Sequence, residues 1–501
     1  MTASINPLLL VTFSPLLGVL IILLLGKRYK ESARWVALAT SLVTFGIALW
    51  LLFLFNAADG GIQLEIKRPW FSLGGNVISF HLGVDGISIL MVLLTAFLSP
   101  LAILSTWKAV EERVEGFMSF FLMLETGLMG VFLSLDMVLF YIFWEFTLVP
   151  MYFLIGMWGS QRRVYAALKF VLYTMVGSLL MLAGILWLGL RYGGFNLTEL
   201  TSATIPISAQ LWLFGAFGLA FAIKVPMWPL HSWLPDAHTE APTAGSVILA
   251  GVLLKMGAYG FLRFNLALFP EATLKLAPWL AGLAVVGILY GAMTAFRQKD
   301  AKRLVAYSSI SHLGFVMLGI FALTAQSVQG AILQMVNHGL STGALFLIVG
   351  MLYERRHSRL LADFGGLWKV MPLMGTLMLI SVLSSVGLPG LNGFVGEFTI
   401  LLGTFNSPFL ASPWFAVIAT LGVILAAVYL LHLFQQLFLG PVTNPENETL
   451  KDLSLREILI LAPILLLSFW IGLYPKPFFM LISPAVDQLL VLIQTAAQTV
   501  H

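Results

Sequence analysis

Long runs of apolar residues, separated by short polar loops, repeat along the chain from one end to the other. A helix that crosses a bilayer needs about 20 such residues, and fourteen runs approach that length, the twelfth with an internal break. The runs cover residues 7–26, 35–55, 86–106, 116–135, 137–159, 168–190, 209–226, 243–265, 276–296, 303–323, 328–352, 370–404, 413–439 and 457–474. The remainder, 476–501, is expected to form a short interfacial or re-entrant helix. The pattern predicts an all-α polytopic membrane protein.

Composition agrees with this fold class. The chain is 59% hydrophobic and only 10% charged, whereas soluble domains carry about 25% charged residues. The first run has no basic region before it and no small-residue cleavage site after it, which predicts a retained span and not a signal peptide. Cysteine is absent, which excludes disulfides and cysteine-ligated iron–sulfur clusters in this chain. We therefore expect a single transmembrane domain over residues 1–501, with any redox chemistry in other chains.

Two of the predicted spans are interrupted, and the interruptions are five spans apart. The seventh span breaks at Lys224–Pro226 and the twelfth at 388–397. Interrupted helices at corresponding positions are typical of transporters built from inverted repeats, and an odd offset reverses the orientation of the second unit. We expect two inverted five-helix repeats, each with a broken helix: spans 4–8 (115–265) and spans 9–13 (276–439), between N-terminal spans 1–3 (1–110) and a C-terminal span with a short tail helix (457–501).

The basic residues predict the orientation of the chain. Nineteen of the 27 Lys and Arg residues lie in one alternating set of loops and six in the other set, while Lys224 and Lys255 lie within spans. By the positive-inside rule the nineteen face the cytoplasm, so both termini face away from it. The long connection 56–84, with Gly-Gly pairs and short alternating stretches, predicts a small hairpin on the outer face. Asp85 and Asp136 fall at span ends and are expected to cap helices.

Four ionisable side chains within or beside the apolar runs are the main candidates for a proton path: Glu145, Lys224, Lys255 and Glu397. A charged group near the bilayer centre costs at least about 2.5 kcal/mol, so such a group marks an ion or proton path by default. A Glu145–Lys224 pair that forms and separates would change the proton affinity of the lysine. The alternative is a static buried ion pair, which is disfavoured because such pairs rarely improve stability over apolar packing.

Polar residues on spans 10 and 11 extend this candidate path. One face of span 11 carries five of them at helical spacing: Gln334, Asn337, His338, Ser341 and Thr342. A polar stripe on an otherwise apolar span indicates contact with water or polar partners, not with lipid. Span 10 adds His312, and the pKa of an unperturbed histidine lies near neutrality. His312 and His338 are therefore predicted to act in a proton relay, with hydrogen-bonded core histidines as the alternative.

Four further residues are secondary candidates, each with a structural alternative. Glu125 in span 4 would tune Glu145 or face a neighbouring chain. His231 and His238, in the hinge after the first break, would take up protons from the cytoplasmic side or staple the loop. The spacing of these two histidines is a poor metal signature, and no metal site is expected. His432 in span 13 would begin an exit path or form interhelical hydrogen bonds.

Five stretches together resemble one known family. They read FYIFWEFTLVPMYFLIGMWG, AIKVPMWPLHSWLPDAHTEAPTAGSVILAG, LLKMGAYG, YSSISHLGF and LPGLNGFVGEF, and they are similar to the antiporter-like membrane subunits of respiratory complex I. The M, or chain 4, type, called D in cyanobacteria and chloroplasts, matches best. This type usually carries glutamate after the second break, as Glu397 does here, whereas the L and N types and the multisubunit sodium/proton antiporters usually carry lysine.

The resemblance implies a function and a role for each candidate. It implies a proton-translocating membrane-arm subunit of an NADH:quinone oxidoreductase, coupled to quinone reduction elsewhere in the complex. Glu145 and Lys224 would form the pair between spans 5 and 7, Lys255, His312 and His338 the central relay, and Glu397 the outlet acid. NADH, FMN, iron–sulfur clusters and quinone would be bound by partner subunits, and L-type and N-type subunits would be the neighbours.

Several alternatives stay open on the sequence alone. A subunit of a cation/proton antiporter or of a membrane-bound hydrogenase would share the relay but would be coupled differently. A non-conducting structural subunit would tolerate replacement of the buried charges. The bacterial plasma membrane is preferred over the thylakoid membrane, while the electron donor, NADH or ferredoxin, and the quinone type are left open.

Overall fold

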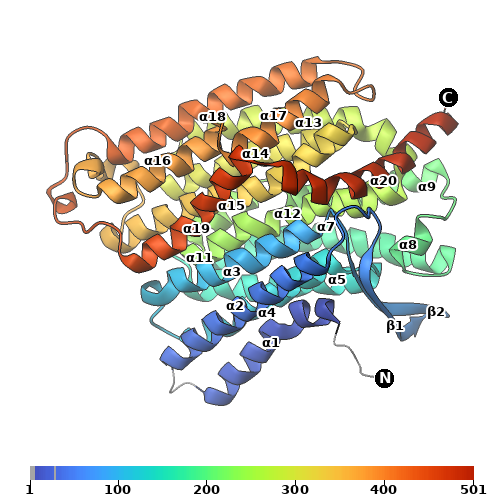
Figure 1. Ribbon diagram of the computed structural model, residues 1–501, viewed down its shortest axis with the longest axis horizontal. Coiled ribbons are helices and arrows are strands. Elements are labelled where there is room, and N and C mark those ends of the chain that lie inside the picture. Colours follow the sequence, from blue (N-terminus) through green and yellow to red (C-terminus); the bar gives the residue numbers. More distant parts are fainter. Residues whose placement is uncertain (1–5, 27–29, 501) are drawn as a thin grey trace.

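A computed structural model describes residues 6–26 and 30–500 of the chain. Lys27 and Arg28, which belong to the basic loops counted above, lie outside the described residues. Within the described part, fourteen helices are long and apolar enough to cross a membrane by length and composition. They form one bundle in which most helices run along the longest axis (Figure 1), and the predicted all-α membrane fold is confirmed.

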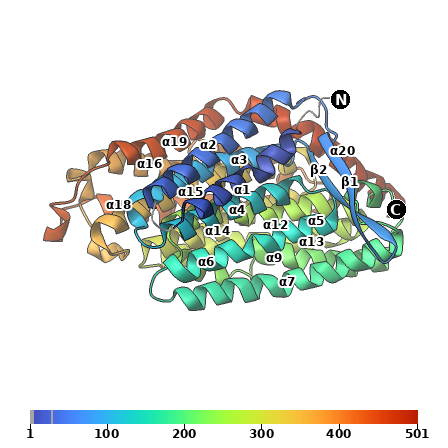
Figure 2. The same cartoon turned by 90° about the horizontal axis from the view of Figure 1, so that it is seen from below.

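The N-terminal part consists of three long helices and a hairpin. Their bounds are α1 Pro7–Leu25, α2 Lys30–Leu54, β1 Gln63–Leu73, β2 Asn76–Val84 and α3 Ile89–Ala109. The two strands pair antiparallel, with Lys67 opposite His81, and they project from the end of the helix bundle at which α1 begins (Figures 1 and 2). The hairpin predicted between the second and third spans is therefore present.

Spans 4 to 8 contain two kinds of helix break. The elements are α4 Val114–Leu133, α5 Met137–Phe146, α6 Leu148–Trp158, α7 Arg163–Tyr192, α8 Leu197–Leu200, α9 Ile207–Lys224, α10 Trp233–Glu240, α11 Thr243–Ile248, η1 Leu249–Leu253, α12 Leu254–Gly260 and η2 Phe261–Leu266. The eighth span thus alternates α-helical with π-helical turns, η1 and η2. The fifth span is interrupted at Thr147, whose hydroxyl donates to the carbonyl of Trp144 at 2.8 Å.

Spans 9 to 13 are followed by two further helices. The elements are α13 Pro270–Phe296, α14 Ala301–Phe321, α15 Ala325–Arg356, η3 Leu361–Asp363, η4 Leu367–Lys369, α16 Pro372–Val386, α17 Asn392–Phe405, α18 Trp414–Phe438, η5 Pro445–Asn447, α19 Leu455–Leu473 and α20 Lys476–Val500. The two predicted interruptions lie between α9 and α10 and between α16 and α17. The inverted relation of the two repeats stays a prediction.

Protein groups satisfy much of the backbone at both breaks, as an apolar environment demands. In the first, the indole of Trp233 donates to the carbonyl of Ile223 at 2.8 Å. In the second, the side-chain amide of Asn337 donates to the carbonyl of Asn392 at 2.7 Å. Gly387 and Gly390 adopt φ values of 86° and 94° there, a region that glycine occupies without a steric penalty.

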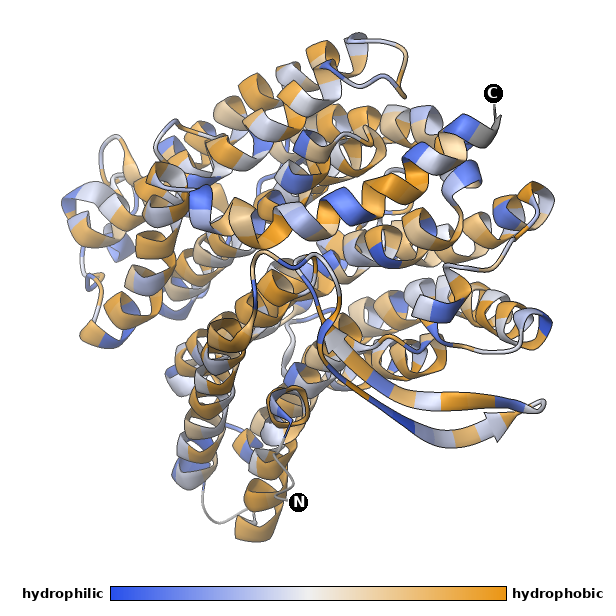
Figure 3. Ribbon diagram, turned by 45° about the vertical axis from the view of Figure 1, so that its right-hand side comes forward, coloured by the Kyte–Doolittle hydropathy of each residue, from blue (hydrophilic) through white to orange (hydrophobic). Residues whose placement is uncertain are grey.

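The core lies along three helical spans. The most apolar windows of 243–266 and of α15 are completely buried, and that of α14 is 94% buried. The outer helices instead expose large apolar side chains, such as Trp35, Phe53 and Trp279, and hydrophobic residues colour most of their length (Figure 3). Polar residues on the three central spans are therefore shielded from the surroundings of the bundle.

The C-terminal tail is longer than the sequence indicated. Residues 476–500 form one continuous helix of 25 residues, α20, instead of the expected short helix. It packs on α13 and α15, and its backbone closely approaches the glycines at the base of the hairpin: a Cβ added to Gly86 would lie 2.2 Å from the carbonyl oxygen of Leu481. The end of α20 and the start of α1 lie at the hairpin end of the bundle (Figures 1 and 2).

Candidate proton path

Lys255 lies at the centre of the buried eighth span, between its two π-helical turns. The Nζ atom donates to the carbonyl oxygen of Ala250, in η1, and is 2.7 Å from Nδ1 of His338 on α15. A π turn leaves a carbonyl outside the regular hydrogen-bond ladder, and such turns are frequent at functional sites. The extra residue in η1 thus supplies an acceptor for an ammonium group that is 0% exposed.

From His338 the polar contacts continue through the second repeat. The rings of His338 and His312 are 6.0 Å apart, centroid to centroid. His312 Nδ1 is 2.8 Å from Oε1 of Glu397, just after the second break. The structure therefore joins four predicted site residues into one buried line, which we call the central line: Lys255, His338, His312 and Glu397.

Three further side chains form hydrogen bonds at the Glu397 end of the central line. The sequence indicated Gln334 and Asn337 only as part of a polar stripe and did not indicate Tyr429. Gln334 donates to Glu397 Oε1 at 3.1 Å, and Asn337 donates to the amide oxygen of Gln334 at 3.2 Å. The hydroxyl of Tyr429 on α18 is 3.1 Å from Nε2 of His312. A signal for Tyr429 existed, because it shares the buried face of its helix with Gly422 and Ala426, where small residues allow close helix packing.

The fifth and seventh spans hold the other two main candidates, Glu145 and Lys224, in a different way. Lys224 is 0% exposed, and its Nζ makes no hydrogen bond with any residue that the structure describes. It lies 5.4 Å from the ring of Trp144 and 5.2 Å from that of Phe170. Glu145 is half-buried, and its Oε1 has no hydrogen-bond partner. Among the described residues, neither group forms an ion pair within 4 Å. The predicted pair is therefore separated in this structure.

Lys224 and the central line lie on neighbouring helices without a polar bridge between them. α9 packs on α12, where a Cβ added to Gly257 would lie 2.5 Å from the carbonyl oxygen of Phe221. No hydrogen bond between the described residues joins Lys224 to Lys255. The two lysines are thus close in the fold but separate in the hydrogen-bond network.

Two of the secondary candidates lie in or beside the hinge after the first break. The imidazole of His238 is buried and stacks on Phe346, with ring centroids 4.6 Å apart, and it lies within electrostatic range of Lys255 and Lys302. His231 contacts the ring of Tyr290 edge-on at 4.9 Å. The structure therefore brings His238 near the central line. His231 instead contacts Tyr290 on α13.

The remaining secondary candidates are Glu125 and His432. Glu125 is 1% exposed, and among the described residues neither of its carboxylate oxygens has a hydrogen-bond partner within 3.5 Å. The side chain of Ser99 interacts with it. His432 is half-buried and contacts the ring of Phe296 at 5.1 Å. No hydrogen bond between the described residues joins it to Tyr429 or His312, so the structure does not bring it to the central line.

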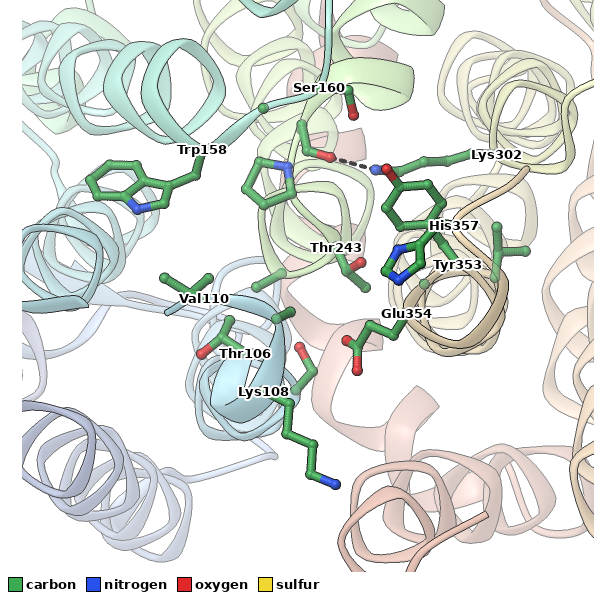
Figure 4. Close-up of a pocket in the computed structure, with 18 of the residues that line it drawn as sticks. Thr106, Lys108, Val110, Trp158, Ser160, Thr243, Lys302, Tyr353, Glu354 and His357 are labelled. Carbon is green, nitrogen blue, oxygen red and sulfur yellow. Dashed lines mark hydrogen bonds between the residues drawn. The ribbon is translucent and has the colours of Figure 1, made fainter. Parts of the chain in front are cut away.

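A cavity of about 670 Å³ opens at the end of the bundle that carries the basic loops. Its polar lining includes Lys108, Thr243, Lys302, Glu354 and His357, which come from four separate helices (Figure 4). Lys302 lines the cavity while being only 6% exposed, and it donates to the carbonyl oxygen of Ala241 (Figure 4). The sequence predicted a loop position for Lys302, because the predicted tenth span begins at residue 303. In the structure Lys302 lies in the first turn of α14, two residues after the N-cap Asp300.

The opposite end of the eighth span carries an ion pair that the sequence did not predict. Arg263 in η2 and Asp85, which precedes α3, face each other with two nitrogen–oxygen distances of 2.7 and 2.6 Å. The sequence assigned Arg263 to an outer loop and Asp85 to a cap; Asp85 does accept from the backbone of Ile87 and Ser88, both at 3.0 Å. Asp136 is the N-cap of α5, as predicted.

The fold and these contacts define a class: an antiporter-like membrane subunit with a buried row of titratable side chains. The family described as NADH:quinone oxidoreductase/Mrp antiporter, TM, matches residues 134–427. NADH-quinone oxidoreductase subunit M of Rhodobacter capsulatus is 44% identical, over 97% of this chain and 96% of the relative. The chain belongs to the family of NADH-quinone oxidoreductase subunit M, and the resemblance seen in the sequence is confirmed.

Solved structures agree with this assignment. A chain of respiratory complex I from Thermus thermophilus with bound NADH superposes with a TM-score of 0.88 at 34% identity, over 97% of this chain and 99% of that chain. A chain of the Mrp complex from Dietzia sp. superposes with a TM-score of 0.83 at 20% identity, over 99% and 100%. At that identity the second likeness concerns the fold alone, and the antiporter alternative gains no separate support from it.

Proposed function

We propose that this chain is a proton-translocating membrane-arm subunit of an NADH:quinone oxidoreductase. The observation that carries the proposal is the central line, in which Lys255 of the eighth span is followed by His338, His312 and Glu397 in the core of the bundle. Each member of the line can bind or release a proton. A structural subunit needs no such row of buried ionisable groups, because their burial costs free energy that apolar packing would not.

Glu145 and Lys224 supply the driving step of the proposed mechanism. Bringing the carboxylate to about 4 Å from the ammonium changes their interaction by about 4 kcal/mol at an effective dielectric constant of 20. That energy shifts the proton occupancy of the lysine by about three orders of magnitude. Closure of the pair holds the proton on Lys224, and opening, as in the described structure, releases it toward Lys255. Water carries it there, since no side chain bridges the two lysines.

The cavity at the basic-loop end is the proposed inlet. Thr243 and Lys302 line it, and His238 lies within electrostatic range of both Lys302 and Lys255. A proton taken up there reaches Lys255, then passes through His338 and His312 to Glu397. The proposed outlet is beyond Glu397, towards the face on which the hairpin lies.

The proposal also places the chain in its complex. The chain holds no cysteine and the described residues contain no group of three or more potential metal ligands. NADH, FMN, the iron–sulfur clusters and quinone are assigned to partner subunits, with L-type and N-type subunits as neighbours. The chain would lie in a bacterial plasma membrane with both termini on the non-cytoplasmic side.

The first experiment compares wild type with Glu145→Gln in proteoliposomes that contain the whole complex, following proton uptake and quinone reduction together. We expect pumping to be lost and electron transfer to slow, because the driving pair lacks its negative member. Unchanged pumping would contradict the proposal and favour a non-conducting structural subunit. Replacement of NADH by ferredoxin as electron donor in the same assay tests the donor independently.

A further inference from the structure

We propose that the Asp85–Arg263 ion pair seals the eighth span on its outer side, so that Lys255 does not exchange protons directly with the outer aqueous phase. The inference rests on the proposed function, because a seal matters only if Lys255 carries protons. Asp85 and Arg263 would act as positioning residues that keep the proton on the route through His338 instead of releasing it along the eighth span itself.

The eighth span offers a second, direct route from Lys255 towards the outer face. Lys255, Tyr259 and Arg263 follow one another at four-residue intervals along the span. Eight residues at 1.5 Å each put Arg263 about 12 Å from Lys255 along the axis. The hydroxyl of Tyr259 donates to the carbonyl of Phe132 at 2.9 Å and accepts from Nε of Arg263 at 3.0 Å.

Every polar group on this route is already occupied. The one hydroxyl proton of Tyr259 is committed to Phe132, and its acceptor side faces a guanidinium that does not release protons. Both carboxylate oxygens of Asp85 accept from Arg263, and Oδ1 also accepts two backbone N–H groups. Burial raises the pKa of Asp85, but the Arg263 guanidinium and these hydrogen bonds outweigh that effect and hold the pKa below its usual value.

The position of the pair agrees with a sealing role. Asp85 and Arg263 are 4% and 8% exposed, and the residues next to Arg263 on its span, Leu262, Phe264 and Leu266, are fully buried. A buried guanidinium held by both oxygens of a carboxylate presents to Tyr259 a group that neither releases nor accepts protons. The amine of Lys255 points in the other direction, toward Ala250. Proton movement outward along this span therefore requires the pair to break.

The test measures passive proton flux in proteoliposomes that contain the whole complex, driven by a potassium diffusion potential without electron donor. In the double variant Asp85→Asn/Arg263→Gln we expect the passive flux to rise by about tenfold, the change in rate that about 1.4 kcal/mol of barrier produces. Electron transfer should stay near the wild-type rate while the proton gradient falls. The charge swap Asp85→Arg/Arg263→Asp, which preserves the pair, should restore tightness.

Two further variants separate a specific route from general damage. Adding Lys255→Met to the leaking double variant should return the passive flux to the wild-type level, because the route starts at Lys255. The matched control is Glu457→Gln, which breaks the similarly bidentate pair with Arg355 at the opposite end of the bundle and should not increase the flux. If the double variant does not assemble, Arg263→Lys carries the same test, because it keeps the charge and loses the bidentate contact.

The seal is overturned if the double variant is as tight as wild type, or if its leak persists without Lys255. Failure of the proposed function would look different: Lys255→Met alone would then pump protons normally. The two outcomes are independent, since pumping by Lys255→Met concerns the central line and passive flux concerns the outer end of the eighth span.

Discussion

The two lysines buried within the membrane spans, Lys224 and Lys255, are held in opposite ways. Lys255 is bound by a carbonyl oxygen and an imidazole, whereas Lys224 faces aromatic rings and has no hydrogen-bond partner. Both ammonium groups are 0% exposed. Hydrogen bonds fix the position of a buried ammonium group, whereas a buried charge without them is positioned only by the packing around it. Lys224 on the seventh span is thus poised to change its charge or contacts, whereas Lys255 on the eighth span begins a connected path.

The largest contrast should come from removing each lysine. Lys224→Met and Lys255→Met are both expected to lower proton pumping by about 100-fold or more, the range associated with loss of a positioned proton-transfer group. Their stabilities should differ: Lys255→Met leaves His338 and the Ala250 carbonyl unpaired, at a cost of about 1–3 kcal/mol, whereas Lys224→Met removes an unpaired charge. Thermal unfolding of the purified complexes checks this, and equal stabilities would remove the distinction between the two lysines.

A smaller contrast is expected between two replacements of Lys224. Lys224→Ala removes the charge, whereas Lys224→Arg keeps it without allowing its release, because arginine stays protonated. We expect Lys224→Arg to retain several-fold more electron-transfer activity than Lys224→Ala, with pumping impaired in both. Quinone reduction and proton uptake measured on the same vesicles test this, and full pumping by Lys224→Arg would show that proton release from Lys224 is not required.

The smallest effect concerns the thirteenth span. Tyr429→Phe removes the hydroxyl next to His312, a hydrogen bond with a net value of about 1 kcal/mol, so pumping is expected to fall by about fivefold. His432→Ala, which removes a side chain that contacts Phe296 instead of His312, serves as the matched control and should leave pumping unchanged. Equal losses in both variants would mean that the whole helix, and not its contact with His312, matters for pumping.

The sequence predicted most of the fold because membrane spans have a strong signal. A run of about 20 apolar residues has few alternatives in a bilayer, and prolines and glycines marked both helix breaks. The length of α20 was underestimated, since Pro484 and polar residues such as Asp487 and Gln488 interrupt its apolar pattern. The amphipathic helix keeps those polar residues on one side, a property that a simple count of apolar residues does not register.

The candidate residues could be found from the sequence, but their contacts could not. Charge within an apolar run identified Lys224, Lys255 and Glu397, while nothing in the chain indicated that Glu145 and Lys224 would be apart. Arg263 and Lys302 were assigned to loops because they lie near span ends, where basic residues are common. Only the packing of distant segments shows that Arg263 meets Asp85 and that Lys302 is buried.

The π-helical turns of the eighth span have a consequence for the register of the chain. Each residue of an α-helix turns the side-chain direction by about 100°, so one extra residue in η1 and another in η2 set the direction of Lys255 independently of both ends of the span. The end at Thr243 faces the cavity and the end at Arg263 faces Asp85, while the lysine between them faces α15. A single-residue deletion in 249–253 would keep every side chain of the path yet aim Lys255 away from His338.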